Sequence, residues 1–314
     1  MNNLRRITAT LAASLALVAA GCGQGNPSAP KTEAEVLGTS ATTALGRVDG
    51  PLVVAVGDIS CPPGSAVSAL ACDQSATARL AAGYRPRRVL VLGDSQYDSG
   101  LLSAYRNSYA RTWGAFKSIT KPVPGNHEYL TRGASGYYRY FRDQQAGAPG
   151  YYAFNVGAWR IYALNSNCDR ISCTRENRWL GRNMAAHPHR CSAITMHHPR
   201  YSSGEHGSNA FLRPMWRTAM RHHTDLALAG HDHDYERFAK LNAFGEPARA
   251  GIASFVSGTG GRGLRDFATP VTGSVVRDSS AFGVLALRLG KAAYAWEYKT
   301  VGGEVVDTGT GRCT

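Results

Sequence analysis

Two histidines separated by one residue, His231 and His233, lie directly behind an apolar run late in the chain. That run, residues 226–229, is typical of a short buried strand, so the histidines lie where a strand passes into a loop. Imidazole nitrogens are common ligands of transition metals. A single His-x-His pair also occurs on surfaces that bind no metal, so the pair indicates a metal site only if further ligands accompany it.

Four other predicted strands also end just before a residue able to bind a metal. The pairs are 52–56 before Asp58, 88–92 before Asp94, 119–123 before Asn126 and 192–196 before His197. Predicted helices at 74–82, 102–116, 174–186 and 209–221 separate the strands. In open α/β sheets the functional crevice lies at the carboxyl ends of the strands. The sequence therefore predicts an α/β fold that gathers these polar residues at one edge.

Antiparallel strands accompany these alternating elements. Residues 152–156 and 159–164 predict a β-hairpin around Gly157-Ala158. Residues 282–289 and 292–299 have the pattern of a second antiparallel pair near the end of the chain. With 314 residues, 43% of them hydrophobic, the chain can bury a sizeable core.

The first 22 residues have the pattern of a signal peptide. Arg5 and Arg6 precede an apolar run at 7–20, which is too short for a comfortable membrane span. Cys22 follows small residues as in a bacterial lipobox, which implies a lipid-anchored lipoprotein, although Ala19 stands where a larger aliphatic residue is usual. A cleaved signal without lipidation is the alternative. Either one predicts an exported protein, secreted or held at the outer face of the cell membrane.

A tether and one catalytic domain should follow the signal peptide. Residues 23–50 are rich in Gly, Ser, Pro, Ala and Thr and show no apolar periodicity, which predicts a flexible linker. The folded domain should span 51–314, because no second linker or internal repeat appears after Pro51.

The remaining cysteines are even in number, as expected in an oxidising compartment. They are Cys61, Cys72, Cys168, Cys173, Cys191 and Cys313. We expect three disulfides, in which Cys61–Cys72 and Cys168–Cys173 close short loops and Cys191 pairs with Cys313. Metal ligation is the alternative, although no Cys-x-x-Cys pair supports it.

The formal net charge of +13 favours anionic partners. The arginines are scattered along the sequence instead of forming runs or alternating with aromatic residues. Dedicated nucleic-acid binding is therefore disfavoured. A phosphorylated substrate or an anionic envelope polymer fits this charge equally well.

The polar segments together resemble the five ordered blocks of the calcineurin-like metallophosphoesterases, over residues 52–289. The blocks are Gly57-Asp58, Gly93-Asp94-x-x-Tyr97, Gly125-Asn126-His127-Glu128, His197-x-Pro199-x-Tyr201 and Gly230-His231-x-His233-x-Tyr235-Glu236-Arg237. Most of that superfamily has Asp-x-His in the first block, whereas Ser60 stands at the histidine position here. This exchange, together with Tyr97, resembles the purple acid phosphatases. The resemblance implies a four-layer α/β/β/α sandwich of two mixed sheets flanked by helices.

The resemblance also implies two metal ions about 3.5 to 4 Å apart. Their ligands would be Asp58, Tyr97 and His233 for one ion, Asn126, His197 and His231 for the other, and Asp94 as the bridge. The first set is hard and anionic and suits Fe3+, whereas the neutral second set suits Fe2+, Zn2+ or Mn2+. Because the ordinary pKa of tyrosine is about 10, Tyr97 can bind as phenolate only beside a strong positive charge. A buried aromatic side chain without a metal is the alternative for Tyr97.

For the reaction, the resemblance implies attack of a metal-bound hydroxide on phosphorus. His127 would stabilise the phosphoryl group or protonate the leaving oxygen, and His206 would be a second substrate histidine. Glu128 and Asp232 would orient ligands. His198 should point away from the site, because neighbouring side chains of an extended segment alternate. We expect surface or capping roles for His187, His189, His222 and His223.

These observations predict an exported phosphatase that hydrolyses phosphate monoesters, with an acidic optimum. A phosphodiesterase or nucleotidase that uses the same centre is the close alternative, because the blocks define the chemistry and the loops select the substrate. A non-catalytic envelope binding protein with a decayed site is the distant alternative.

Overall fold

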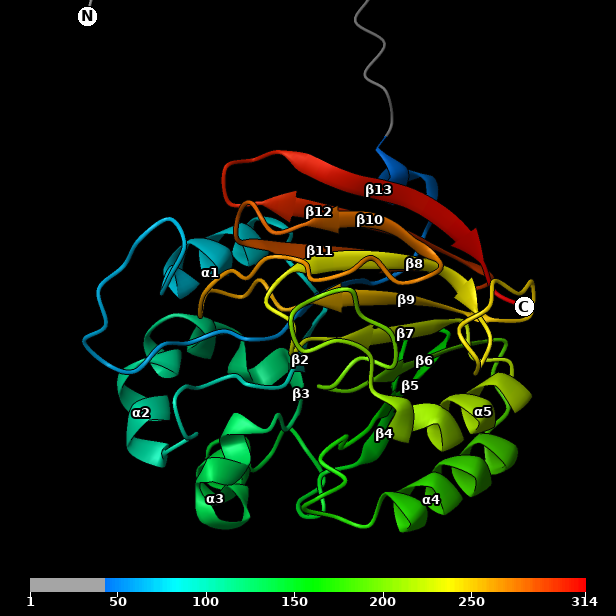
Figure 1. Ribbon diagram of the computed structural model, residues 1–314, viewed down its shortest axis with the longest axis horizontal. Helices are drawn as coiled ribbons and strands as arrows, with labels where there is room; N and C mark the ends of the chain where they lie inside the picture. Colours follow the sequence, from blue (N-terminus) through cyan, green and yellow to red (C-terminus); the bar gives the residue numbers. More distant parts are fainter. Residues whose placement is uncertain (1–42) are drawn as a thin grey trace, which may run out of the picture. The chain divides into compact units, whose positions relative to one another are not determined.

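The computed structural model describes residues 43–314, which form two β-sheets flanked by helices (Figure 1). The predicted signal peptide, Cys22 and most of the predicted linker lie outside the described residues. The first sheet has the strand order β13-β12-β11-β1-β2-β3, and the second has the order β10-β8-β9-β7-β6-β5-β4. None of the described helices is long and apolar enough to span a membrane.

The strands of the first sheet are β1 (Leu52–Val56), β2 (Arg88–Leu92), β3 (Thr120–Val123), β11 (Gly283–Leu289), β12 (Ala293–Thr300) and β13 (Val305–Arg312). Those of the second are β4 (Tyr152–Val156), β5 (Trp159–Ala163), β6 (Cys191–Thr195), β7 (Leu226–Ala229), β8 (Tyr235–Leu241), β9 (Ile252–Ser257) and β10 (Ser274–Asp278). Both sheets are mixed: β1, β2 and β3 are parallel, as are β5, β6, β7 and β9, and the other pairings are antiparallel.

Alternate residues of each central strand face opposite layers, as the two-residue period of a strand requires. In β1, Val53 and Ala55 pack against the second sheet, while Val54 and Val56 pack beneath the helices on the other side. Both faces of the strand are therefore apolar, which explains the uninterrupted run of valines. The four-layer sandwich predicted from the sequence is confirmed.

The described chain also contains five α-helices and six short 3-10 helices. The α-helices are α1 (Gln74–Gly83), α2 (Leu102–Asn107), α3 (Ser135–Tyr140), α4 (Cys173–Ala186) and α5 (Arg213–Arg221). The 3-10 helices are η1 (Ala44–Arg47), η2 (Tyr109–Arg111), η3 (Trp113–Ile119), η4 (His127–Leu130), η5 (Arg132–Ala134) and η6 (Ala210–Leu212). Helices α4 and α5 pack side by side on the outer face of the second sheet (Figure 1).

The prediction of one continuous helix at 102–116 is wrong. The segment divides into α2, η2 and η3, with non-helical dihedral angles at Ser108 and Thr112. The Ser108 hydroxyl donates a hydrogen bond to the Cys61 carbonyl, and the Tyr109 amide donates one to Gln96 Oε1. The Gln96 side chain thus takes the Tyr109 amide, which in a continuous helix would bond to the carbonyl four residues earlier.

The packed structure also begins before Pro51, the boundary that the composition suggested. Helix η1 lies within the stretch predicted as linker and contacts β12 and β13. Leu45 is buried there in the core on the helical side of the first sheet, which explains the earlier start. The three predicted disulfides are confirmed as Cys61–Cys72, Cys168–Cys173 and Cys191–Cys313.

Candidate metal centre

The loops after β1, β2, β3, β6 and β7 converge at one edge of the two sheets and carry the polar residues singled out in the sequence. Three of these residues lie in tight turns with positive φ: Asp58, Asp94 and His231 have φ values of 59°, 45° and 76°. Positive φ is uncommon for residues other than glycine and concentrates at functional sites. The sequence thus tolerates unfavourable backbone geometry where the candidate ligands meet.

Two glycines allow these loops to approach one another. A Cβ atom on Gly93 would lie 2.5 Å from His197 Nδ1, and Gly93 has a φ of 86°. A Cβ atom on Gly125 would lie 2.1 Å from Asp94 Oδ1. Any side chain at either position would displace a candidate ligand, which explains the glycine that precedes Asp94 and the one that precedes Asn126.

Asp58, Tyr97 and His233 form the first group of donor atoms. The Tyr97 hydroxyl donates to Asp58 Oδ1 at 2.8 Å and lies 3.1 Å from His233 Nε2. His233 Nδ1 lies 2.8 Å from the Gly263 carbonyl oxygen. Because a carbonyl can only accept, Nδ1 carries the proton and the Nε2 lone pair faces Tyr97 and Asp58, as in metal-binding histidines.

Asn126, His197 and His231 form the second group. His197 Nε2 lies 2.9 Å from Asn126 Oδ1 and 3.2 Å from His231 Nδ1. His197 Nδ1 lies 2.9 Å from the Leu92 carbonyl oxygen, so its proton points to the backbone of β2 and its Nε2 points into the site. The same histidine orientation therefore occurs in both groups.

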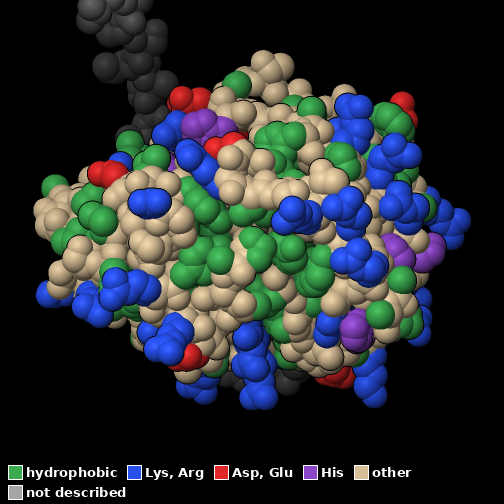
Figure 2. Space-filling view, turned by 90° about the horizontal axis from the view of Figure 1, so that it is seen from below, with side chains coloured by type: hydrophobic (Ala, Val, Ile, Leu, Met, Phe, Trp, Pro, Cys, Tyr) green, Lys and Arg blue, Asp and Glu red, His purple; other side chains and the backbone are tan. Residues whose placement is uncertain are grey.

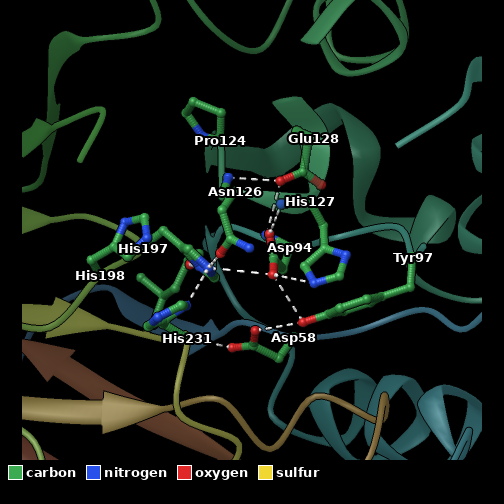
Figure 3. A network of polar contacts seen from close by, with 12 residues as sticks. Asp58, Asp94, Tyr97, Pro124, Asn126, His127, Glu128, His197, His198 and His231 are labelled. Carbon is green, nitrogen blue, oxygen red and sulfur yellow. Dashed lines mark hydrogen bonds and ion pairs between the residues drawn. The ribbon is translucent and has the colours of Figure 1, made fainter. Parts of the chain in front are cut away.

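Asp94 joins the two groups (Figure 3). Its Oδ2 lies 3.0 Å from the Tyr97 hydroxyl oxygen and 3.3 Å from His197 Nε2. Its Oδ1 accepts from the His127 backbone amide at 2.9 Å. A single carboxylate thus contacts one member of each group, as a bridging ligand between two ions would.

Burial and charge set the protonation of these groups. Burial raises the pKa of Asp94, but His197 and His127 outweigh it and hold that pKa well below its usual range. Burial lowers the pKa of His197, but Asp94 outweighs burial and raises it to about 10. Burial, and then Asp58 and Asp94, raise the pKa of Tyr97 well above its ordinary value. Only a strongly charged cation beside the phenol oxygen would convert Tyr97 to a phenolate.

The donor atoms fit a pair of metal ions. Ligand atoms of Asp58, Asp94 and His197 lie within 4.8 Å of one another, and so do those of His197, His198 and His231. The first group offers a carboxylate and a phenol, which suit a hard, highly charged ion, and the second offers an amide oxygen and imidazoles, which suit a divalent ion. Asp94 supplies the shared carboxylate.

Glu128 fixes the loops that carry these ligands. This fully buried carboxylate accepts hydrogen bonds from the backbone amides of Asp94, Ser95 and Gly125. It also accepts from the Tyr105 hydroxyl at 2.9 Å. The loops after β2 and β3 are therefore tied to the same side chain.

The two predicted catalytic histidines lie on the open side of the donor groups. His127 Nδ1 lies 2.6 Å from the Asp98 carbonyl oxygen, which leaves Nε2 free, 3.9 Å from Asp94 Oδ2. The exposed ring of His206 stacks on that of His231 with centroids 4.5 Å apart, and the His206 amide donates to Asp232 Oδ1. Both rings can therefore meet a substrate that approaches from solvent.

The prediction that His198 points away from the site is wrong. Its ring centroid lies 4.4 Å from that of His231. The alternation of side chains applies to an extended strand, whereas β6 ends at Thr195 and the backbone bends at His197 and His198.

Ser166 is a residue that the sequence reading missed, and it holds His198 in place. Its hydroxyl lies 2.9 Å from His198 Nδ1 and accepts from the His198 amide at 2.9 Å. Ser166 lies just beyond the carboxyl end of β5. The polar segment Asn165-Ser166-Asn167 after that strand carries the same signal that identified the other loops.

Known proteins resemble this chain in sequence and in fold. The family model for calcineurin-like phosphoesterases matches residues 52–235. A probable purple acid phosphatase 20 of Arabidopsis thaliana is 26% identical over 165 residues, which cover 44% of this chain and 39% of the relative. The chain thus spans less than half the length of that curated relative.

Solved structures share the fold. The purple acid phosphatase PPD1 from seeds of yellow lupin, Lupinus luteus, superposes with a TM-score of 0.64 at 18% identity, over 84% of this chain and 54% of the other. GAP50, the anchor in the inner membrane complex of Plasmodium, gives a TM-score of 0.59 at 15% identity, over 84% of this chain and 89% of that chain. PhoD gives a TM-score of 0.56 at 13% identity, over 85% of this chain and 69% of that chain.

Proposed function

Because this chain belongs to the calcineurin-like phosphoesterase family, we propose that it is an exported hydrolase of phosphate monoesters that works with two metal ions. The observation that carries the proposal is the position of Asp94 between an anionic and a neutral group of donor atoms. Asp58, Tyr97 and His233 would hold Fe3+, and Asn126, His197 and His231 would hold Fe2+, Zn2+ or Mn2+. The pair of ions would activate water and neutralise the phosphate oxygens.

The remaining steps fall to side chains around the donor groups. In monoester hydrolysis a water oxygen bonds to phosphorus while the bond from phosphorus to the alcohol oxygen breaks, and that oxygen takes up a proton. We assign the donation of this proton to His127 Nε2, because the Asp98 carbonyl accepts from Nδ1 and leaves Nε2 directed at the site. His206, stacked on His231, would bind a phosphate oxygen.

Disulfides support the exported location that the first 22 residues predict. Two of the three bonds border this site: Cys61 follows the loop of Asp58, and Cys168 follows Ser166. Such bonds persist in oxidising compartments. Expression of the full chain in a bacterial host, followed by fractionation and mass analysis of Cys22, tests export and the lipid anchor. Protein retained in the cytoplasm would contradict this part of the proposal.

The catalytic proposal is tested by metal analysis together with hydrolysis of p-nitrophenyl phosphate and its bis-ester. We expect two metals per chain, faster cleavage of the monoester and, for iron-loaded protein, a visible tyrosinate absorption band that Tyr97→Phe removes. Asp94→Asn should lower both metal content and rate, whereas His187→Ala, which changes an exposed histidine outside the site, should change neither. A faster rate with the diester would favour a phosphodiesterase. Two bound metals without any hydrolysis would favour a binding protein.

A further inference from the structure

The outer face of α4 and α5 carries six exposed arginines, which we call the arginine face. They are Arg175, Arg178 and Arg182 on α4, and Arg213, Arg217 and Arg221 on α5. Although the arginines are dispersed in the sequence, the packing of the two helices brings them onto one surface. Blue side chains gather on the right of Figure 2, the side on which Figure 1 shows α4 and α5.

The arginine face lacks the acidic residues that usually neutralise such a surface. Glu176 is the one acidic residue in α4 and is fully buried, and α5 contains none. Among the ion pairs of the described residues, none involves these six arginines. The positive charge therefore faces solvent without a partner from these two helices.

This arrangement works against helix stability. Arg213, Arg217 and Arg221 are four residues apart, and like charges at that spacing destabilise a helix. Arg175 and Arg213 also lie in the first turns of their helices, where a positive charge opposes the helix dipole. A surface selected only for solubility would have mixed signs of charge. A bound polyanion would offset these costs.

Both helices begin beside the candidate metal centre. Helix α5 follows Phe211, whose ring centroid lies 6.0 Å from that of His198. Helix α4 begins behind the loop of Ser166, and its Glu176 accepts a hydrogen bond from the Asn165 amide at 2.7 Å. The arginine face therefore starts next to the site and leads away from it.

At the other end of the helices, a pocket of about 210 Å³ continues the basic surface. Its lining includes Arg221 and four histidines, His187, His189, His222 and His223. The pocket also contains Ser192, in the first half of β6, whereas the metal centre lies beyond the opposite end of that strand. Arg213 and Arg221 alone span about 12 Å along this direction, at 1.5 Å per residue.

We propose that the arginine face binds a linear chain of phosphates and delivers its end to the metal centre. This rests on the proposed phosphatase function and names its substrate class, inorganic polyphosphate. Water would attack the terminal phosphorus, the anhydride bond to the next phosphate would break, and the shortened chain would leave with the proton on its new terminal oxygen. Arg182, Arg217 and Arg221 would position the chain without contacting the reacting atoms.

The surface chemistry favours this occupant over two others. A membrane-docking helix presents large apolar side chains, and single-stranded nucleic acid needs aromatic platforms along its path. Among the described residues, the exposed large hydrophobic side chains include none on α4 or α5. Phe211 precedes α5 at the site end, and the exposed Phe244 lies beside Arg213, whose guanidinium carbon is 5.6 Å from the ring centroid. The arginine face thus offers charge along both helices and one exposed aromatic ring, beside Arg213, which suits a ligand made only of phosphate better than one that needs a row of stacking rings.

The test compares two triple variants of the full chain. R182Q/R217Q/R221Q removes three charges from the arginine face, and R79Q/R106Q/R111Q removes three exposed charges beside the helices of the first sheet. For long-chain polyphosphate we expect the first variant to raise KM about tenfold, equivalent to about 1.4 kcal/mol. The slope of log KM against log salt should fall by about 2. Rates with p-nitrophenyl phosphate and tripolyphosphate should stay within twofold of wild type for both variants.

Equal effects of the two triple variants on long-chain polyphosphate would overturn the proposal, and so would an unchanged KM. Binding is measured separately, with labelled polyphosphate, oligothymidylate and phosphatidylglycerol vesicles on metal-free protein. Tighter binding of oligothymidylate or vesicles than of polyphosphate would assign the face to nucleic acid or membrane instead. Wild-type protein could hydrolyse none of the substrates and still bind polyphosphate through the arginine face. In that case the proposed function fails and the docking surface stands.

Discussion

At the scale of single residues, the orientation of three of the imidazoles follows from one backbone carbonyl each. Leu92, Gly263 and Asp98 accept the Nδ1 protons of His197, His233 and His127. In each case Nε2 is left to face the site. A carbonyl can only accept a hydrogen bond, so the geometry fixes a proton on Nδ1 of each of these rings.

His127→Ala tests the division between ligands and proton donor. We expect the variant to keep its metal content and lose about 10² to 10⁴ in kcat, because general acid catalysis has that typical magnitude. The loss should shrink for substrates whose leaving alcohol is acidic and needs no proton. His189→Ala is the matched control, since its ring is exposed on the far side of β6. An unchanged kcat, or a loss of metal, would contradict the assignment.

The sequence sufficed for these residues only where a strand leads straight into a short turn. Asp58, Asp94 and Asn126 each follow a β-strand within three residues, so their meeting follows from the parallel order of the sheet. His198 and Ser166 could not be placed in this way, because their mutual position depends on a bend after β6 and on the loop after β5. Such contacts are set by tertiary packing and not by local periodicity.

At the scale of elements, α4 is anchored at the site by a buried acid. Glu176 Oε1 accepts from the Asn165 amide, and Oε2 has no partner among the described residues. Burial raises the pKa of Glu176 from 4.5 to about 8, although the Asn165 hydrogen bond opposes this. The folded chain therefore holds a proton that the unfolded chain has released across this window of pH.

This difference makes a signed prediction for stability. Between pH 4.5 and about 8 the folded state binds the extra proton, so the free energy of unfolding falls with rising pH, by up to about 1.4 kcal/mol per unit. Glu176→Gln keeps an acceptor for Asn165 and should remove this contribution. Urea unfolding at pH 5 and pH 8 measures this contribution. The unfolding free energy of the variant minus that of wild type should be larger at pH 8 than at pH 5. If the unfolding free energies of both proteins fell by the same amount between pH 5 and pH 8, Glu176 would be ionised in the folded state.

Sequence patterns identified elements best where the core is apolar on both faces. Strands β1, β2 and β6 were predicted within a residue or two, because their runs of Val, Leu, Ile and Ala are uninterrupted. Strands β8 and β13 were missed, since Tyr235–Leu241 contains Glu and Lys, and Val305–Arg312 is rich in Gly and Thr. Both are held by pairing with a neighbouring strand, which sequence alone does not show.

At the scale of the whole molecule, the arginine face shows a property that the linear sequence conceals. The scattered arginines argued against dedicated nucleic-acid binding, yet helical periodicity and the packing of α4 against α5 collect six of them. Each helix buries one stripe against the second sheet through Leu180, Met184, Met215 and Trp216. The opposite stripes must then face solvent together. Charge patterns are therefore better interpreted after the helices have been placed.

The disulfide between Cys191 and Cys313 ties the last residues of the chain to the start of β6, across both sheets. It spans 122 residues, whereas Cys168–Cys173 spans 5. In the chain-entropy model the longer loop should contribute about 5 kcal/mol and the shorter about 2 kcal/mol, because closing a longer loop removes more freedom from the unfolded chain. Cys191→Ala/Cys313→Ala should therefore lower the unfolding free energy more than Cys168→Ala/Cys173→Ala.

Chemical denaturation of both double variants under oxidising conditions measures this difference. Loss of the longer bond should also release β13, which pairs only with β12 within the described sheet, so its amides should exchange faster with solvent than those of β1. The candidate metal centre lies at other strand ends, and p-nitrophenyl phosphate hydrolysis by the folded Cys191→Ala/Cys313→Ala variant should persist. Equal destabilisation by the two variants would mean that strain or packing, and not loop entropy, determines what these bonds contribute.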